Sequence, residues 1–292
     1  MTSPFARPAV AVDVGGPDAP GAVRWAAREA SLRGATLRLV QVLPRRRAHG
    51  RAGHDLDDAA QIIAATAPAT PVERVVAVGP APGRLVAESR TAELLVVGAR
   101  RRDGLRSALG AAPVGLAVAR SAHCPVAVVP DPRPAPDPTL PVVVGVEGSR
   151  ADEAAIGFAF AAAAARDVAL LAVHAWADHV GDGSAADLAD WDRIGAEESA
   201  LLDERLARSV AAHPGVAVER ICRSTSATRL LVELSRCAQL VVIGSHGHGP
   251  IAGHLVDAAG HGLARAAACP WVVARTMAAP VATGASRSRR HG

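Results

Sequence analysis

The sequence contains one series of segments twice, and this duplication constrains the fold more than any other feature. In the front half of each copy, AVAVDVGG (9–16) matches VVVGVEGS (142–149), and LRLVQVL (37–43) matches LLAVHAW (170–176). In the back half, the matching pairs are PVERVVAV (71–78) with AVERIC (217–222), AELLVVGAR (92–100) with AQLVVIGSH (238–246), and AHCPVAVVP (122–130) with AACPWVVAR (267–275). The distance along the sequence between matching segments is about a dozen residues larger for the back-half pairs than for the front-half pairs. The second copy therefore carries an insertion before its VER segment.

The segments around the copies set the expected domain boundaries. Between the copies lies DPRPAPDPTLP (131–141), whose proline at nearly every second position predicts a stiff, extended linker. The segment 276–292 consists largely of small residues and arginines and is expected to be a disordered basic tail. We therefore expect a first domain at 1–130, the linker, a second domain at 142–275, and the tail.

Hydrophobic patterning predicts the fold class. Runs such as VVVGV and LVVIG are short, β-branched and apolar throughout, which indicates strands buried on both faces and hence a parallel sheet. Segments with helical spacing separate these runs, with apolar residues at i, i+3, i+4 and i+7: Val23, Ala26, Ala27 and Ala30 in the first copy, and Ala227, Leu230, Leu231 and Leu234 in the second. A Ser-Thr-Ser segment before Ala227 is able to cap the second of these helices. The expected class is α/β, with two tandem doubly wound (Rossmann-like) domains that each contain a five-stranded parallel sheet.

The composition excludes several function classes. The 292 residues contain no lysine, which removes a P-loop, a lysine Schiff base and a lysine general base. A net charge of +4 and scarce aromatic residues argue against nucleic-acid binding. The N-terminal segment lacks a signal-peptide core, and no apolar run approaches the roughly 20 residues that span a bilayer, so a cytoplasmic protein without membrane contact is expected. The four cysteines show no C-x-x-C spacing and are expected to be buried free thiols.

Doubly wound sheets bind ligands at the carboxyl ends of their strands, so the loops after the first and fourth strand of each copy are the candidate sites. The first strand ends in an acid, Asp13 or Glu147. Either carboxylate can accept hydrogen bonds from a ribose or an adenine edge, or bind a cation. Alternatively, it caps the following helix, and the sequence leaves these alternatives open. The fourth strand ends in Gly98 or Gly244, where the backbone can approach an anion closely, or where a tight turn requires glycine.

These segments together resemble the universal stress protein family, over nearly the whole chain and twice over. The resemblance implies a tandem two-domain member, and the ATP-binding members of the family use a G-x2-G-x9-G-[S/T] motif together with the strand-1 aspartate. In the second copy Gly244 and Gly247 match the first two glycines, but Asp257 and Ala258 stand where the motif has Gly-Ser. Glu147 replaces the usual aspartate.

The first copy departs further from the motif. Gly98 matches, but Arg101 takes the second glycine position. Strict counting then reaches Ala111 and Ala112, although Gly110 and Ala111 stand one residue earlier. Nucleotide binding is therefore expected mainly in the second copy.

The resemblance implies a stress-response module that binds an adenine nucleotide, ATP, without turnover. The expected ligand-binding residues are Glu147, Gly244, Ser245, His246, Gly247, His248 and Ala258 in the second copy, and Asp13 and Gly98 in the first. The alternative is a scaffold of the same fold that dimerises and binds partners without nucleotide. No enzyme is expected, because adjacent Ser245 and His246 point apart and no nucleophile elbow is present.

Two further features have more than one interpretation. The histidines His246, His248, His254 and His261 form a basic, proton-sensitive anion loop, a metal site, or a set of solvated side chains, and the first two stand where relatives commonly carry arginine. The last strands, PVAVVP and PWVVA, lie where family members pair edge to edge. In a tandem chain the copies are expected to pair internally there, with Trp271 at the interface or in the core and with a homodimer as a further option.

Overall fold

The computed structural model describes residues 8–43, 53–99, 114–130, 137–148, 152–176, 188–245 and 254–276. Strands and helices alternate along them, as the patterning predicts. The elements of the first copy are β1 (Ala9–Asp13), α1 (Ala19–Arg33), β2 (Thr36–Leu43), α2 (His54–Thr66), β3 (Val72–Val78), α3 (Ala81–Glu88), β4 (Leu94–Gly98), α4 (Val114–Ser121) and β5 (Val126–Val129). Those of the second copy are β6 (Val142–Val146), α5 (Asp152–Arg166), β7 (Leu170–Ala175), α6 (Leu188–Ala212), β8 (Val218–Arg223), α7 (Ala227–Leu234), β9 (Leu240–Gly244), α8 (His254–Ala266) and β10 (Trp271–Ala274).

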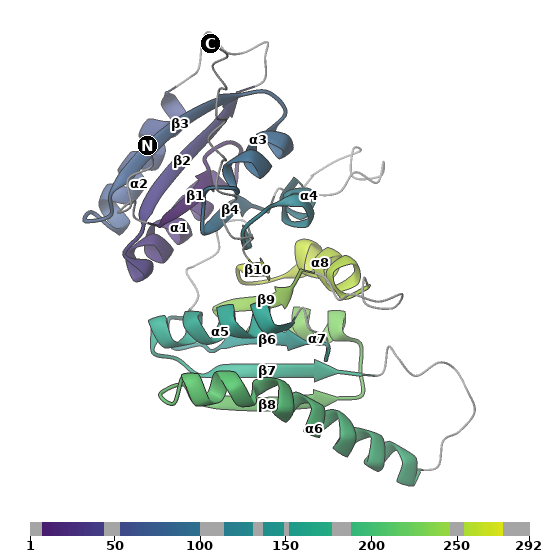
Figure 1. The fold of residues 1–292 in the computed structure, drawn as a ribbon. Coiled ribbons are helices and arrows are strands. Elements are labelled where there is room, and N and C mark those ends of the chain that lie inside the picture. Colours follow the sequence, from purple (N-terminus) through teal and green to yellow (C-terminus); the bar gives the residue numbers. More distant parts are fainter. Residues whose placement is uncertain are drawn as a thin grey trace, which may run out of the picture.

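The two five-stranded sheets join into one sheet of ten strands, ordered β3-β2-β1-β4-β5-β10-β9-β6-β7-β8 (Figure 1). All pairs within a copy are parallel, which confirms the expected doubly wound sheet. The junction is antiparallel, with Trp271 opposite Val128 and Val273 opposite Val126. The expected internal pairing of the last strands is thus confirmed, and it covers two edges that would otherwise be exposed.

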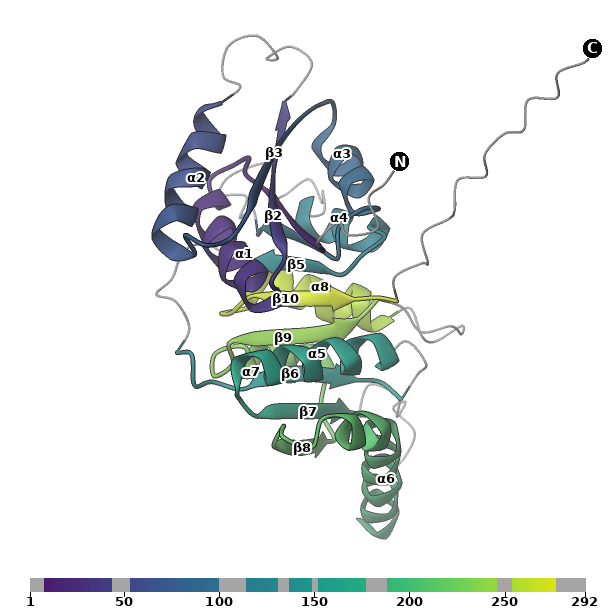
Figure 2. The ribbon, with the colours of Figure 1, turned by 60° about the vertical axis from the view of Figure 1, so that its left-hand side comes forward.

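Helices cover both faces of the sheet (Figure 2). One face packs against α1, α2, α5 and α6, and the other against α3, α4, α7 and α8. Successive strand residues serve opposite faces: Val10 and Val12 belong to the first core, and Ala11 between them belongs to the second. Trp271 is fully buried in the second core.

Helices α1 and α5 end in the same way. Gly34, in the left-handed conformation at φ 61°, donates its amide to Ser31, and the next amide reaches back to Ala30. Asp167, at φ 53°, ends α5 with the equivalent pair of bonds to Ala164 and Ala163. The Ser-Thr-Ser segment behaves differently from expectation, because the Ser226 side chain makes no capping hydrogen bond to α7.

The insertion in the second copy extends one helix. The 25 residues of α6 correspond to 13 in α2. Both helices are tied to the outer strand of the sheet by an equivalent ion pair, Asp57–Arg74 at 2.8 Å in the first copy and Asp203–Arg220 at 2.5 Å in the second.

The end of the linker is a turn rather than an extended segment. The amide and hydroxyl of Thr139 donate to Asp137 Oδ1, and Gln239 Nε2 donates to the carbonyls of Pro138 and Leu140. Residues 131–136 of the linker and the tail from 277 onward lie outside the described residues.

The cysteines are free thiols, as expected, but they are not all buried. Cys124 and Cys269 are fully enclosed, and burial raises the pKa of each to about 12. Cys222 is half-buried and Cys237 is exposed, so the expectation is wrong for Cys237. Among the described residues, no helix has the length and apolar character needed to cross a membrane.

Candidate functional site

The first and fourth strands of each copy lie side by side and diverge at their carboxyl ends. In the second copy β6 and β9 are paired from Val142–Leu240 to Val144–Val242 and no farther. On its other side, β6 stays paired with β7 as far as Val146. The divergence marks the reversal in strand order, where doubly wound sheets open a crevice. It brings Glu147, Gly244 and Ser245 to the same edge of the sheet.

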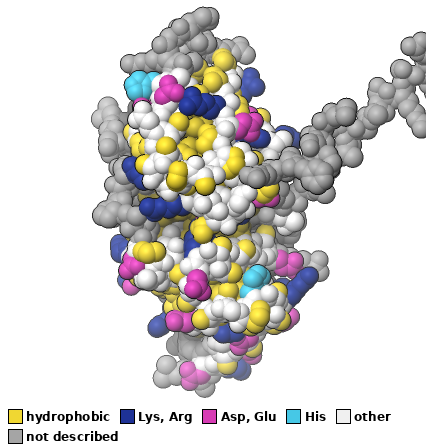
Figure 3. Space-filling view, turned by 90° about the vertical axis from the view of Figure 1, so that its left-hand side faces the viewer, with side chains coloured by type: hydrophobic (Ala, Val, Ile, Leu, Met, Phe, Trp, Pro, Cys, Tyr) yellow, Lys and Arg dark blue, Asp and Glu magenta, His cyan; other side chains and the backbone are white. Residues whose placement is uncertain are grey.

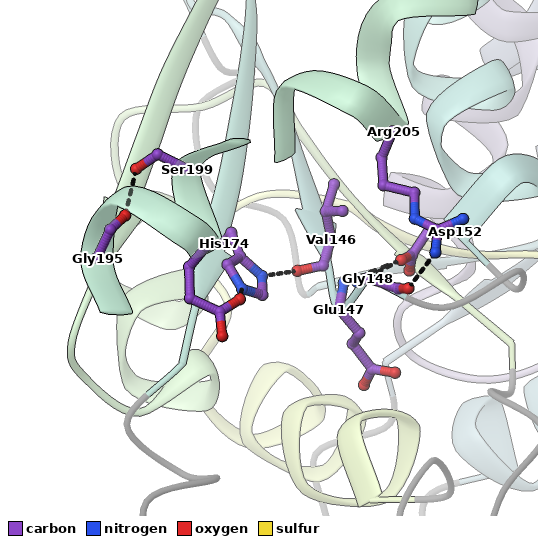
Figure 4. A network of polar contacts seen from close by, with 9 residues as sticks. Val146, Glu147, Gly148, Asp152, His174, Gly195, Ser199 and Arg205 are labelled. Atoms are coloured by element: carbon purple, nitrogen blue, oxygen red, sulfur yellow. Dashed lines mark hydrogen bonds and ion pairs between the residues drawn. The ribbon is translucent and has the colours of Figure 1, made fainter. Parts of the chain in front are cut away.

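Glu147 follows directly on β6 and is only partly exposed. Its carboxylate accepts no hydrogen bond from any residue that the structure describes, and it points away from the neighbouring polar pairs (Figure 4). Burial, with a smaller contribution from Asp152, raises its pKa to about 7. A partly buried carboxyl group with this raised pKa is a candidate ligand-binding group.

The turn that carries Glu147 is fixed by its own chain. Asp152, almost fully buried at the start of α5, accepts hydrogen bonds from the amides of Glu147 (3.1 Å) and Gly148 (2.8 Å). Arg205 Nη2 of α6 donates to the Gly148 carbonyl at 2.7 Å. These two amides are therefore occupied, and the turn offers the Glu147 side chain rather than its backbone.

Glycine is favoured at position 148 for two reasons. Its φ of 90° is a conformation that residues with a side chain rarely adopt. In addition, a Cβ atom there would lie 2.8 Å from Leu201 Cδ2 of α6, so the Leu201 side chain would have to shift.

A buried histidine links this turn to α6. His174 of β7 is 2% exposed; its Nδ1 lies 2.7 Å from the Val146 carbonyl and its Nε2 lies 2.8 Å from Glu198 Oε2 (Figure 4). Gln41 takes the matching place in the first copy, where its Nε2 donates to Asp55 of α2. Each copy thus uses a buried polar residue of its second strand to hold the following helix.

The first copy differs at both predicted positions. Val10 and Val142 pair with the matching residues Leu94 and Leu240, so Gly15 takes the position of Glu147 and the expected match between Asp13 and Glu147 is wrong. Asp13 is buried, and its Oδ1 accepts the amide of Gly15 at 3.0 Å, so it stabilises its own turn. The residue at the N-cap of α1 is Asp18, so the helix-cap interpretation of Asp13 is wrong. A Cβ atom at Gly98 would lie 2.7 Å from Asp18 Cβ, which means that internal packing already requires this glycine.

The structure places part of the predicted site. Gly244 ends β9, Ser245 is half-buried beside it, and Ala258 is exposed on α8. His246, Gly247 and His248 lie outside the described residues, as do the side chains of His254 and Asp257.

Sequence reasoning did not identify four residues of the second copy: Asp152, His174, Glu198 and Arg205. The signal for the first was present, because an acid stands at the start of the first helix in each copy, Asp18 just before α1 and Asp152 as the first residue of α5. The other three depend on where α6 lies. Within the described part of the chain, no group of three or more histidines, cysteines, aspartates and glutamates is placed to hold a metal ion.

Comparison with known proteins agrees with the duplicated fold. The profile of the universal stress protein family matches residues 6–130 and again residues 139–275. The chain belongs to the universal stress protein family. Universal stress protein Rv2623 of Mycobacterium tuberculosis is 38% identical over 285 residues, which cover 89% of this chain and 93% of that protein. Universal stress protein Rv1996 of the same organism is 32% identical over 300 residues, covering 91% and 94%.

Solved structures share the arrangement of both copies. A universal stress protein from Archaeoglobus fulgidus superposes with a TM-score of 0.63 at 15% identity, covering 91% of this chain and 96% of that one. At this identity the likeness concerns the fold alone. It covers the tandem arrangement in which two doubly wound units follow one another in one chain.

Proposed function

We propose that this universal stress protein is a stress-response module that binds one adenine nucleotide, such as ATP, in its second copy and does not turn it over. The observation that carries the proposal is Glu147. It presents a partly buried carboxyl group, without a hydrogen-bond donor among the described residues, at the diverging ends of β6 and β9. Ribose hydroxyls are donors of the kind that such a carboxylate accepts.

The first copy offers less to a ligand. Strand pairing places Gly15, which has no side chain, at the position of Glu147. Asp13 lies two residues earlier and already accepts the Gly15 amide, and Gly98 accommodates Asp18. Arg101 stands at the second glycine position of its loop. We therefore assign the nucleotide to Glu147, Gly244 and Ser245, together with the loop residues His246, Gly247 and His248 and the exposed Ala258.

The expected affinity is low. Ala258 supplies no hydroxyl to the phosphates, and Asp257 adds a negative charge to the segment where the family motif has glycine. Each lost hydrogen bond to a charged group costs about 1.5–3 kcal/mol, or one to two orders of magnitude in affinity. If the added charge costs a similar amount, the two changes together weaken a micromolar site by about two to four orders of magnitude, to a dissociation constant of about 0.1–10 mM.

A thermal-shift titration with ATP, ADP and AMP at millimolar concentrations tests the assignment. The melting temperature should rise with nucleotide, because ligand binding to the native state alone stabilises it. Gly247→Arg should abolish the rise. Gly215→Arg adds the same charge in an exposed turn of the same copy, with open space around it, and should leave the rise unchanged.

A scaffold without nucleotide is the second candidate function. The observation that favours it is the internal engagement of both strand-1 turns, by Gly15 in the first copy and by Asp152 in the second. If no nucleotide changes the melting temperature of the unmodified protein, the nucleotide proposal fails and the scaffold remains. In either role we expect a cytoplasmic protein. Because β5 and β10 already pair within the chain, a homodimer would have to form through another surface.

A further inference from the structure

A cavity lies where the two copies meet, away from Glu147. Its volume is about 420 Å³, and its walls come from α1, from the end of α5 and from the linker turn at Pro138. The C-terminal ends of α1 and α5 and the residue before β9, Gln239, place it at the amino ends of strands. The nucleotide site proposed above lies at the carboxyl ends. Small-molecule sites have volumes of this order and are common at domain interfaces.

One arginine at the cavity, Arg28, has no ion-pair partner among the described residues. Glu29 is 2% exposed and is neutralised by Arg33 at 2.7 Å and by Arg166, which reaches it from the other copy. Arg28, the next residue along α1, is exposed at the cavity and forms no ion pair with the rest of the described chain. Arg28, Arg166 and Glu29 together give the cavity a formal charge of +1.

Apolar side chains lie beside this arginine. Trp25, Arg28 and Leu32 fall at i, i+3 and i+7 on α1, so they share one face of the helix. Leu32 remains 46% exposed, which is unusual for so large an apolar side chain. The face of the molecule in Figure 3 carries hydrophobic side chains interspersed with both basic and acidic ones.

The linker turn is fixed in the cavity wall by Gln239. Gln239 Nε2 donates hydrogen bonds to the carbonyls of Pro138 (3.1 Å) and Leu140 (2.6 Å). Residues from both copies and from the linker thus surround one space.

We propose that this cavity binds a small aromatic anion, of the aryl carboxylate or aryl sulfonate class, independently of the nucleotide. The ring packs against Trp25 and Leu32, and the anionic group pairs with Arg28. The cavity walls come from both copies, so the bound ligand also stabilises their packing against one another.

Titration with the aryl sulfonate dye 1-anilinonaphthalene-8-sulfonate tests the proposal in the full-length protein. We expect saturable fluorescence enhancement with one dye per chain, accompanied by energy transfer from tryptophan. Arg28→Gln should weaken dye binding at least about tenfold, the value of one charge-assisted hydrogen bond. Arg24→Gln, an exposed arginine one turn earlier on the same helix and outside the cavity, should leave it unchanged.

Competition with a smaller ligand separates the cavity from general dye adhesion. Salicylate should displace the dye, whereas benzyl alcohol, which has the ring but no charge, should not. Arg28 is exposed, so its replacement should leave the circular dichroism spectrum unchanged. Non-saturable dye binding, equal effects of the two arginine variants, or equal displacement by both competitors would overturn the proposal.

Discussion

Replacing Glu29 by glutamine should destabilise the protein by about 3 kcal/mol. Glu29 is 2% exposed and holds two arginines, Arg33 of its own helix and Arg166 of the other copy, whose side chains are 24% and 10% exposed. Removing one partner of a buried ion pair costs about 3–5 kcal/mol, because the other charge stays buried. We expect the lower end, since Arg33 is partly hydrated and also lies 5.0 Å from the centre of the Phe158 ring.

Urea denaturation at pH 7, followed by circular dichroism, measures this loss. The matched control is Glu197→Gln, which removes the acid of the exposed pair Arg193–Glu197 on α6, where the side chains are 60% and 63% exposed. Such surface pairs contribute about 0.5 kcal/mol or less. The double variant Glu29→Gln/Arg166→Met should regain part of the loss, since it no longer buries an unpaired arginine. A loss below about 1 kcal/mol for Glu29→Gln, or one equal to that of the control, would refute the reasoning.

Two further predictions concern the turn after β6. Gly148→Ala should cost about 2 kcal/mol, because it combines an unfavourable φ of 90° with a contact 2.8 Å from Leu201, and thermal denaturation of this variant with and without Leu201→Ala separates the two effects. The folded-state pKa of Glu147, about 7, lies above its ordinary value of 4.5, so the folded state favours the protonated form and stability should rise as the pH falls from about 8 to about 5. Discounted for partial exposure, the gain is about 1.5 kcal/mol; Glu147→Gln should lose it, and an unchanged pH slope in that variant would contradict the assignment.

The duplication made much of the fold predictable. Each strand is a short apolar run, and each copy repeats the same order, so the parallel sheets followed from the pattern alone. The pairing of PVAVVP with PWVVA was also predicted, and the structure places Trp271 opposite Val128. The turn at the end of the linker was not predicted; Thr139 and Asp137 hold it locally, and Gln239, about 100 residues away along the chain, fixes it in place.

The candidate site was less predictable, since sequence spacing does not show which side chains are already engaged. Asp13 and Glu147 look equivalent in the sequence, yet strand pairing puts Asp13 two residues earlier, where it accepts its own turn's amide, whereas Glu147 accepts no bond from the described residues. Gly98 resembles a ligand-approach glycine but is required by Asp18. The contact of Arg205 with Gly148 depends on where the inserted length of α6 lies, which local patterns do not specify.

Isothermal titration calorimetry with ATP, at protein concentrations close to the expected dissociation constant, tests the central claim most directly. The account predicts one nucleotide per chain, with binding strongly weakened by Glu147→Ala and unaffected by Asp13→Asn. Two nucleotides per chain, no detectable binding, or a loss of binding in Asp13→Asn with Glu147→Ala unaffected would contradict it.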